Sequence, residues 1–404
     1  MRLSVRNRPE FDACLDTGYS PRDSIVLRYR HAFDYGNTEK ETTAYKAWLQ
    51  KTSIREGARI LSLLHYRGVE IYLLDETSCM CTRTLKSIDG CVSMALCKSK
   101  GYDRVVFESG GNTGTALTEY GRKAGVETFF FCPAENLFLL NSKTFATGPT
   151  HLIAVEDAAS VKKAARLFSE RNGVKRIPES DWRYMASMFR GCFILEYMMT
   201  NGTFDWLAQT ISAAFGPIGI YRVFNAFAGQ LGAPPRFMGI QQEGNCPMYR
   251  AWKSDAVEKE PEEKGAGGQL LTRVMYDVTP ETYGTYQEFQ GLLSGIRGAL
   301  TTVNHSEFGA LIEHRFDGRT VFDLLRSKGI AISMKDGEVI EKTGLLALVG
   351  TLKEIDRGTI EPESRVLCCL TSGVSDADGR AEPEYRMNHV ETAIEDYSRL
   401  IFNR

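Results

Sequence analysis

The chain has 404 residues, of which 43% are hydrophobic, 10% aromatic and 25% charged. That composition supplies enough apolar material for a large core, favours two domains and excludes disorder, collagen-like repeats and small disulfide scaffolds. Because 49 Lys and Arg residues nearly balance 51 Asp and Glu residues, neither a nucleic acid nor a membrane surface is an expected partner.

The cysteines and the apolar runs bear on metal binding and location. Ten cysteines are spread along the chain without a C-x-x-C pair, and Cys79 and Cys81 are too close together for a zinc knuckle, so no structural metal is expected. No apolar run approaches the roughly 18 residues that cross a bilayer. Since free cysteines suit a reducing compartment, the sequence predicts a cytoplasmic protein.

Lys86 is the first candidate functional residue along the chain. It ends the segment Thr82-Arg-Thr-Leu-Lys86 and has apolar neighbours at Ile88 and Val92. Most lysines are solvated surface groups, and that outcome stays open for Lys86 taken alone. A partly desolvated lysine, however, has a lowered amine pKa and can form a Schiff base.

A strand, a glycine-rich loop and a helix follow. Arg104 to Glu108 is predicted to be a buried strand, Asn112 to Lys123 a helix and Val126 to Cys132 a second strand. The loop Ser109-Gly-Gly-Asn-Thr-Gly114 suits an anion, because glycines allow close backbone approach and free N–H groups at a helix start attract negative charge. It lacks the patterns of dinucleotide and P-loop sites, so NAD and ATP are disfavoured. A plain tight turn remains the alternative.

Strands and helices continue to alternate through the rest of the chain. The predicted strands are His151 to Val155, Ala208 to Phe215, Arg236 to Gln241 and Val366 to Leu370, and the predicted helices are Ala158 to Arg171 and Ile220 to Leu231. This order favours an α/β fold of mostly parallel sheets covered by helices, with ligands at the carboxyl ends of the strands. The polar stretch Lys253 to Gly268 is expected to be an exposed loop.

Two further segments carry possible ligand contacts. Gly216-Pro-Ile-Gly219 is predicted to be a loop that opens a helix and therefore a second anion site, although Pro217 removes one donor. Two such sites suit a phosphate-bearing cofactor beside an amino-acid carboxylate. Leu370-Thr-Ser-Gly373 places hydroxyl groups at the end of an apolar strand, where one of them could meet a cofactor ring.

In this order, the four segments resemble those of the pyridoxal-phosphate enzymes of fold type II, the tryptophan synthase β-subunit family, and most closely its threonine synthase-like branch. The likeness covers nearly the whole chain after about residue 55. In that family a lysine carries the cofactor and an [ST]-S-G-N-T-G loop follows it, as Asn112 follows Lys86 after 26 residues. A glycine loop then binds the phosphate, and a strand ending in L-T-G supplies a hydroxyl, matching Leu370 and Thr371.

The resemblance implies a role for each matched residue. Lys86 would hold pyridoxal 5'-phosphate and then act as a general base. Asn112 would bind the ring hydroxyl, and the substrate carboxylate would be held by Ser109, Gly110, Gly111, Asn112 and Thr113. The cofactor phosphate would lie at Gly216, Pro217, Ile218, Gly219 and Ile220. Thr371, or else Ser372, would face the ring nitrogen, where a neutral hydroxyl favours elimination and replacement over transamination.

The resemblance also implies a domain organisation. Residues 1–88 and 196–404 would form a larger domain that anchors the cofactor, and residues 89–195 a smaller mobile domain that binds the substrate carboxylate. The family further implies a homo-oligomer, a dimer or higher.

The expected activity is the replacement of phosphate on an O-phospho amino acid. The chain departs from the branch at Lys86-Ser-Ile-Asp-Gly90 and at Pro217 and Ile218, and it most resembles the cysteate synthases. That resemblance implies conversion of O-phospho-L-serine and sulfite to L-cysteate and phosphate, for coenzyme M biosynthesis. A threonine synthase acting on O-phospho-L-homoserine and water, and a non-catalytic paralogue that binds the cofactor, remain alternatives. Candidate cations for the leaving phosphate are Arg83, Lys143 and Arg190.

Overall fold

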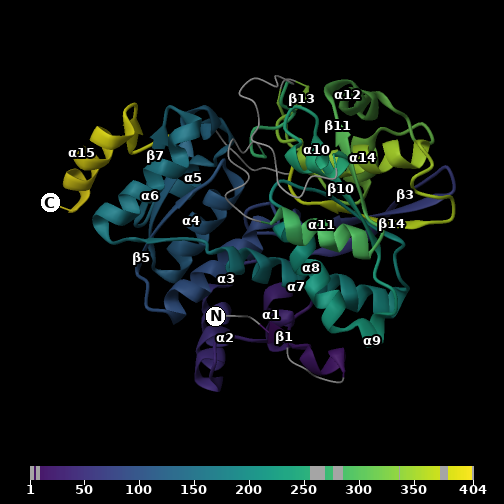
Figure 1. Ribbon diagram of the computed structural model, residues 1–404, viewed down its shortest axis with the longest axis horizontal. Coiled ribbons are helices and arrows are strands. Elements are labelled where there is room, and N and C mark those ends of the chain that lie inside the picture. The colour runs from purple at the N-terminus through teal and green to yellow at the C-terminus, as the bar shows by residue number, and fades with distance from the viewer. Residues whose placement is uncertain are drawn as a thin grey trace.

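The fold was obtained as a computed structural model (Figure 1). The structure describes residues 4–5, 10–254, 269–275, 285–335, 337–373 and 381–402. Apart from its first two residues, the expected exposed loop at 253–268 lies outside the described residues. Within them, no helix combines the length and the apolar character that crossing a membrane requires.

A six-stranded sheet forms one half of the molecule (Figure 1). Its strands, in spatial order, are β11 (Ala299–Val303), β10 (Arg236–Gln242), β9 (Trp206–Thr210), β14 (Arg365–Leu370), β4 (Val69–Asp75) and β3 (Arg59–Tyr66). All neighbours are parallel except β3 and β4, which are antiparallel. The carboxyl ends of the parallel strands therefore meet at one edge of the sheet.

Helices cover both faces of this sheet, and the strand side chains alternate between them. Leu367 belongs to the core cluster formed with α7 (Ser180–Asn201) and α8 (Phe215–Ala226). Its neighbour Cys368 belongs to the cluster formed with α14 (Thr343–Asp356). A strand buried on both faces needs apolar residues at every position, which explains the continuous apolar run of β14.

A five-stranded, fully parallel sheet forms the other half. Its strands, in spatial order, are β15 (Tyr385–Met387), β7 (Thr150–Val155), β6 (Glu127–Pro133), β5 (Arg104–Glu108) and β8 (Lys175–Arg176). One face packs in the same core as α3 (Lys86–Ser99) and α4 (Asn112–Ala124). The other packs against α6 (Val161–Asn172) and α15 (Val390–Phe402).

The remaining elements are short or lie at the edges. They are β1 (Ser4–Val5), η1 (Phe11–Cys14), α1 (Ile25–Arg28), η2 (Arg30–Ala32), β2 (Phe33–Asp34), α2 (Glu39–Thr52), η3 (Ala134–Leu139), α5 (Ser142–Phe145), η4 (Ala158–Ser160), α9 (Ala228–Leu231), α10 (Pro247–Lys253), α11 (Tyr286–Gly295), α12 (His305–Glu313), α13 (Val321–Ser327), β12 (Met334–Lys335) and β13 (Glu338–Val339). The amino-terminal helices α1 and α2 pack on α3, and α1 also contacts α7.

The α/β fold class expected from the sequence is confirmed, and two finer expectations need correction. The predicted strand from Ala208 to Phe215 ends at Thr210, and α8 already begins at Phe215. An apolar run does not distinguish a buried strand from a buried helix. The carboxyl-terminal segment, expected within the larger domain, instead adds β15 and α15 to the smaller sheet. The other domain boundaries remain a prediction.

Candidate active site

A cavity of about 270 Å³ lies at the carboxyl ends of β5, β6, β9 and β14. Its volume is close to the lower end of the roughly 300–1,000 Å³ typical of small-molecule sites. Residues from all four segments singled out in the sequence line it, among them Lys86, Ser109, Asn112, Gly216 and Thr371. The fold therefore brings together groups that are more than 280 residues apart in the chain, such as Lys86 and Thr371.

Lys86 is the first residue of α3 and lines the cavity. Its side chain is 31% exposed, and Nζ lies 3.3 Å from Oδ2 of Asp89. The backbone N–H of Lys86 donates to Oγ1 of Thr84, and the N–H of Leu85 donates to the carbonyl oxygen of Thr371. The second of these bonds attaches the lysine segment to the end of β14.

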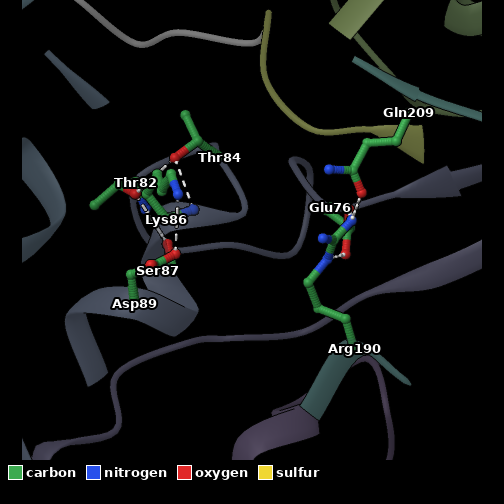
Figure 2. Close-up of polar contacts among 8 residues, drawn as sticks. All are labelled: Glu76, Thr82, Thr84, Lys86, Ser87, Asp89, Arg190 and Gln209. Atoms are coloured by element: carbon green, nitrogen blue, oxygen red, sulfur yellow. Dashed lines mark hydrogen bonds and ion pairs between the residues drawn. The ribbon is translucent and has the colours of Figure 1, made fainter. Parts of the chain in front are cut away.

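Asp89 is a cavity residue that the sequence did not identify as functional. It was noted only as part of a departure from the branch pattern, yet its side chain is 6% exposed and lines the cavity beside Lys86. The side chains of Thr82 and Ser87 lie in the same cluster, with 2.9 Å between their hydroxyl oxygens (Figure 2). The sequence could have indicated this contact, because an acidic residue three positions after a lysine in a helix lies on the same face.

The glycine-rich loop between β5 and α4 turns sharply. Gly111 has φ +151°, a conformation that residues with a side chain rarely adopt. Its N–H donates to the hydroxyl of Ser109 at 3.1 Å, and Asn136 donates to the carbonyl oxygen of Gly110 at 2.8 Å. Ser109, Gly110, Asn112 and Thr113 line the cavity, whereas Gly111 shapes the turn.

The second predicted anion loop meets the cavity only at its first residue, Gly216. The residues along the cavity are Ser212, Ala213, Ala214, Phe215 and Gly216. Pro217, Ile218, Gly219 and Ile220 belong to α8 and do not line the cavity. The N–H of Ile218, expected to face an anion, donates to the carbonyl oxygen of Ala214 instead. Proline is favoured in the first turn of a helix, so Pro217 was the signal for the true helix start.

Arg190 is a buried arginine that lines the same cavity and lies between Glu76 and Gln209 (Figure 2). Nε and Nη2 of Arg190 donate to the two carboxylate oxygens of Glu76 at 2.5 and 2.7 Å, and Nη2 also donates to Oε1 of Gln209 at 2.8 Å. Burial by itself would lower the pKa of Arg190, but the charge of Glu76 and its hydrogen bonds overcome this and raise it. The guanidinium is therefore charged.

Other cations around the cavity differ from those expected. Of the three candidates for a leaving phosphate, Arg190 lines the cavity and Arg83 and Lys143 do not. Among the described residues, Lys162, Arg183 and Arg273 also line the cavity, and the sequence did not single them out. Arg273 is half exposed and forms a 2.5 Å ion pair with Glu135, also a lining residue.

The hydroxyl groups after β14 close another side of the cavity. Thr371 and Ser372 are 5% and 3% exposed, and both line it. The Ser372 hydroxyl is buried and has no hydrogen-bond partner in the part of the chain that the structure describes. A buried polar group without a partner costs free energy, which a bound ligand would recover.

The arrangement fits a ligand with an aldehyde, a phosphate and a ring nitrogen. The amine of Lys86 suits the aldehyde, the start of α8 with Arg190 suits the phosphate, and the unpartnered hydroxyl of Ser372 suits the ring nitrogen. No group of three or more side chains that could hold a metal ion occurs among the described residues.

Comparisons with known proteins point to the same ligand. Residues 55–289 match the sequence model of the family described as pyridoxal-phosphate dependent enzyme. The cysteate synthase of Methanosarcina barkeri (strain Fusaro) is 23% identical over 338 residues, which are 78% of this chain and 74% of that protein. The threonine synthase of Methanosarcina acetivorans is 25% identical over 280 residues, which are 67% of this chain and 62% of that protein.

Solved structures agree on the fold. Maize serine racemase aligns with a TM-score of 0.58 at 13% identity, over 85% of this chain and 97% of its own. Holo diaminopropionate ammonia lyase from Escherichia coli aligns with a TM-score of 0.58 at 11% identity, over 96% of this chain and 95% of its own. The expectation of a fold-type II arrangement is confirmed.

Proposed function

Because the chain belongs to the family of pyridoxal-phosphate dependent enzymes, we propose that it replaces the phosphate of O-phospho-L-serine by sulfite, giving L-cysteate and phosphate. One observation carries the proposal: among the described residues, Lys162, Arg183 and Arg273 line the cavity in addition to Lys86 and Arg190. Cationic side chains of this kind suit a leaving phosphate. Relatives named cysteate synthase support the same choice.

The second candidate is the threonine synthase reaction, with O-phospho-L-homoserine and water. A relative of that name at 25% identity favours it. Both reactions expel phosphate and need the same cations, so the cavity charge does not separate them. They differ in the carbon that bears the phosphate and in the charge of the nucleophile.

Within the proposed reaction, each lining group has a chemical task. Bound pyridoxal phosphate supplies an electron-withdrawing ring that stabilises negative charge developing on the substrate. Nζ of Lys86 holds the cofactor and then removes the proton from the substrate Cα. Asp89, 3.3 Å from Nζ, orients that amine. The loop from Ser109 to Thr113, at the start of α4, binds the substrate carboxylate.

The experiment that tests the proposal incubates the purified holoenzyme with O-phospho-L-serine or O-phospho-L-homoserine, each with and without sulfite, and identifies the amino-acid products. We expect cysteate from phosphoserine plus sulfite and phosphate in equal amount. Threonine from phosphohomoserine would overturn the proposal in favour of the second candidate. Cofactor binding without any phosphate release would instead identify a non-catalytic paralogue.

The two hydroxyls after β14 yield a separate prediction. Ser372→Ala should lower kcat about tenfold, the effect of losing one neutral hydrogen bond of roughly 1–1.5 kcal/mol, and should shift the absorption band of the bound cofactor. Thr371→Ala serves as the matched control, because both side chains are buried at the same strand end. A larger loss in Thr371→Ala than in Ser372→Ala would assign the ring contact to Thr371, as the sequence pattern suggested.

A further inference from the structure

We propose that Arg190 is a charged hydrogen-bond donor to a phosphate monoester at the start of α8, and that this monoester belongs to the pyridoxal cofactor. The inference rests on the family and its cofactor, and it holds whichever substrate the enzyme uses. The sequence analysis expected only backbone groups to bind the cofactor phosphate, and the inference adds the side chain of Arg190 to them.

The first support is an unused donor on a buried cation. Arg190 is 1% exposed, and Nε and Nη2 are fully engaged by Glu76 and Gln209. Nη1 carries two N–H groups and has no hydrogen-bond partner among the residues that the structure describes. The Cys369 thiol lies near the guanidinium, but a neutral thiol is a weak acceptor.

The second support is the direction in which this donor reaches. A Cβ built on Gly216 would lie 3.1 Å from Nη1 of Arg190 and 2.5 Å from Nε2 of Gln209. Both amino groups therefore approach the first turn of α8, and glycine at position 216 leaves the space that they need. Arg190, Gln209 and Gly216 all line the cavity.

The third support is the helix itself. α8 has 12 residues and begins at Phe215, so its start carries the positive end of the helix dipole. Pro217 has no N–H and the N–H of Ile218 is bonded to Ala214, so a phosphate there would depend on the dipole and on a charge-assisted bond from Arg190. Glu76 and Gln209 hold the guanidinium in place, since the carboxylate and the amide fix two of its three nitrogens.

Burial decides between the cofactor phosphate and the substrate phosphate. Arg273 is 49% exposed, and Lys162 and Arg183 are partly exposed, so these cations suit a phosphate that enters and leaves at each turnover. Arg190 is enclosed by Glu76, Gln209 and the start of α8. An enclosed cation suits a resident group, and we assign it to the cofactor.

The test compares two ligands that differ only in the phosphate. Apo-protein is titrated with pyridoxal 5'-phosphate and with pyridoxal, followed by absorbance. The double variant Glu76→Gln/Arg190→Gln removes both charges and so leaves no unpaired buried ion. We expect it to bind pyridoxal phosphate about 10- to 100-fold more weakly, the range for one charge-assisted bond, and to bind pyridoxal as the wild type does. Arg273→Gln is the control cation and should leave both affinities unchanged.

A second readout follows the phosphate directly by ³¹P NMR. The second ionisation of a phosphate monoester falls at about pH 6. In the wild type, the ³¹P chemical shift of the bound cofactor should stay constant through that pH. In the double variant it should change as the phosphate titrates. If the double variant does not fold, Arg190→Lys is measured in the same way, because lysine keeps the positive charge and lacks the planar set of guanidinium donors. Equal weakening of both ligands would overturn the proposal, as would an unchanged cofactor affinity with a raised KM for O-phosphoserine.

Discussion

Replacing Lys86 with alanine is expected to abolish covalent attachment of the cofactor and to lower turnover by about 10³-fold or more. The amine of Lys86 is the nucleophile that would bond the cofactor aldehyde and the base that would move the substrate proton. It lies on the cavity, 31% exposed, and is fixed at the start of α3. The measurement is borohydride reduction of the holoenzyme, tryptic digestion and mass spectrometry of the peptide that carries the pyridoxyl group.

Lys162 provides the matched control for this prediction. Among the described residues it is the second lysine that lines the cavity, so Lys162→Ala tests whether any amine near the ligand would serve. We expect the Lys162→Ala protein to retain a pyridoxyl adduct on Lys86 and the Lys86→Ala protein to have none. An adduct on Lys162, or none on either lysine in the wild type, would disprove the assignment of Lys86.

Local sequence patterns predicted the parts of the site that lie within one segment. Lys86, the turn from Ser109 to Thr113 and the hydroxyls after β14 were all found in this way, and all reach one cavity. Each has a local signature, because glycines, small polar residues and an apolar strand end are visible within about ten residues of chain. The α/β fold was predictable for the same reason, since periodicity is a local property.

Contacts between distant segments were not predictable. The ion pair of Glu76 and Arg190 joins the end of β4 to the middle of α7, and Gln209 joins it from β9. Arg190 was named as one of three candidate cations, but nothing in its own helix indicates a buried carboxylate partner. The placement of β15 beside β7 likewise depends on pairing across more than 200 residues, which no local pattern encodes.

The error at α8 has a different origin. Ala213, Ala214 and Phe215 continue the apolar run of β9, so they resembled strand residues. In the structure Ala214 adopts φ +56° and the chain turns directly into the helix. An alanine in this left-handed conformation is uncommon. Because position 214 is not a glycine, the sequence gives no sign of a turn there. The start of this helix was therefore predicted at Ile220 instead of Phe215.

Gly344→Ala is expected to cost about 3 kcal/mol of stability, at the upper end of the range for overpacked sites, and to weaken cofactor binding at the same time. A Cβ on Gly344 would lie 2.0 Å from the carbonyl oxygen of Ser372 and 2.7 Å from Cδ1 of Leu370. The first contact is with backbone, which no side-chain rotation relieves. The end of β14 must then move, and with it the hydroxyls of Thr371 and Ser372.

The control is Gly309→Ala, a glycine within α12 whose added Cβ would meet nothing within 4 Å. Alanine there should be neutral or stabilising by up to about 1 kcal/mol, because it is the better helix former. The midpoint of thermal unfolding and the absorption band of the cofactor are measured for both variants. Because Ser372→Ala removes the hydroxyl without moving backbone, it should lower kcat and leave the midpoint unchanged, whereas Gly344→Ala should lower both. If Gly344→Ala unfolds at the wild-type temperature and binds the cofactor normally, α14 does not pack against the end of β14 as closely as the structure shows, and the placement of Ser372 at the ring nitrogen loses its support.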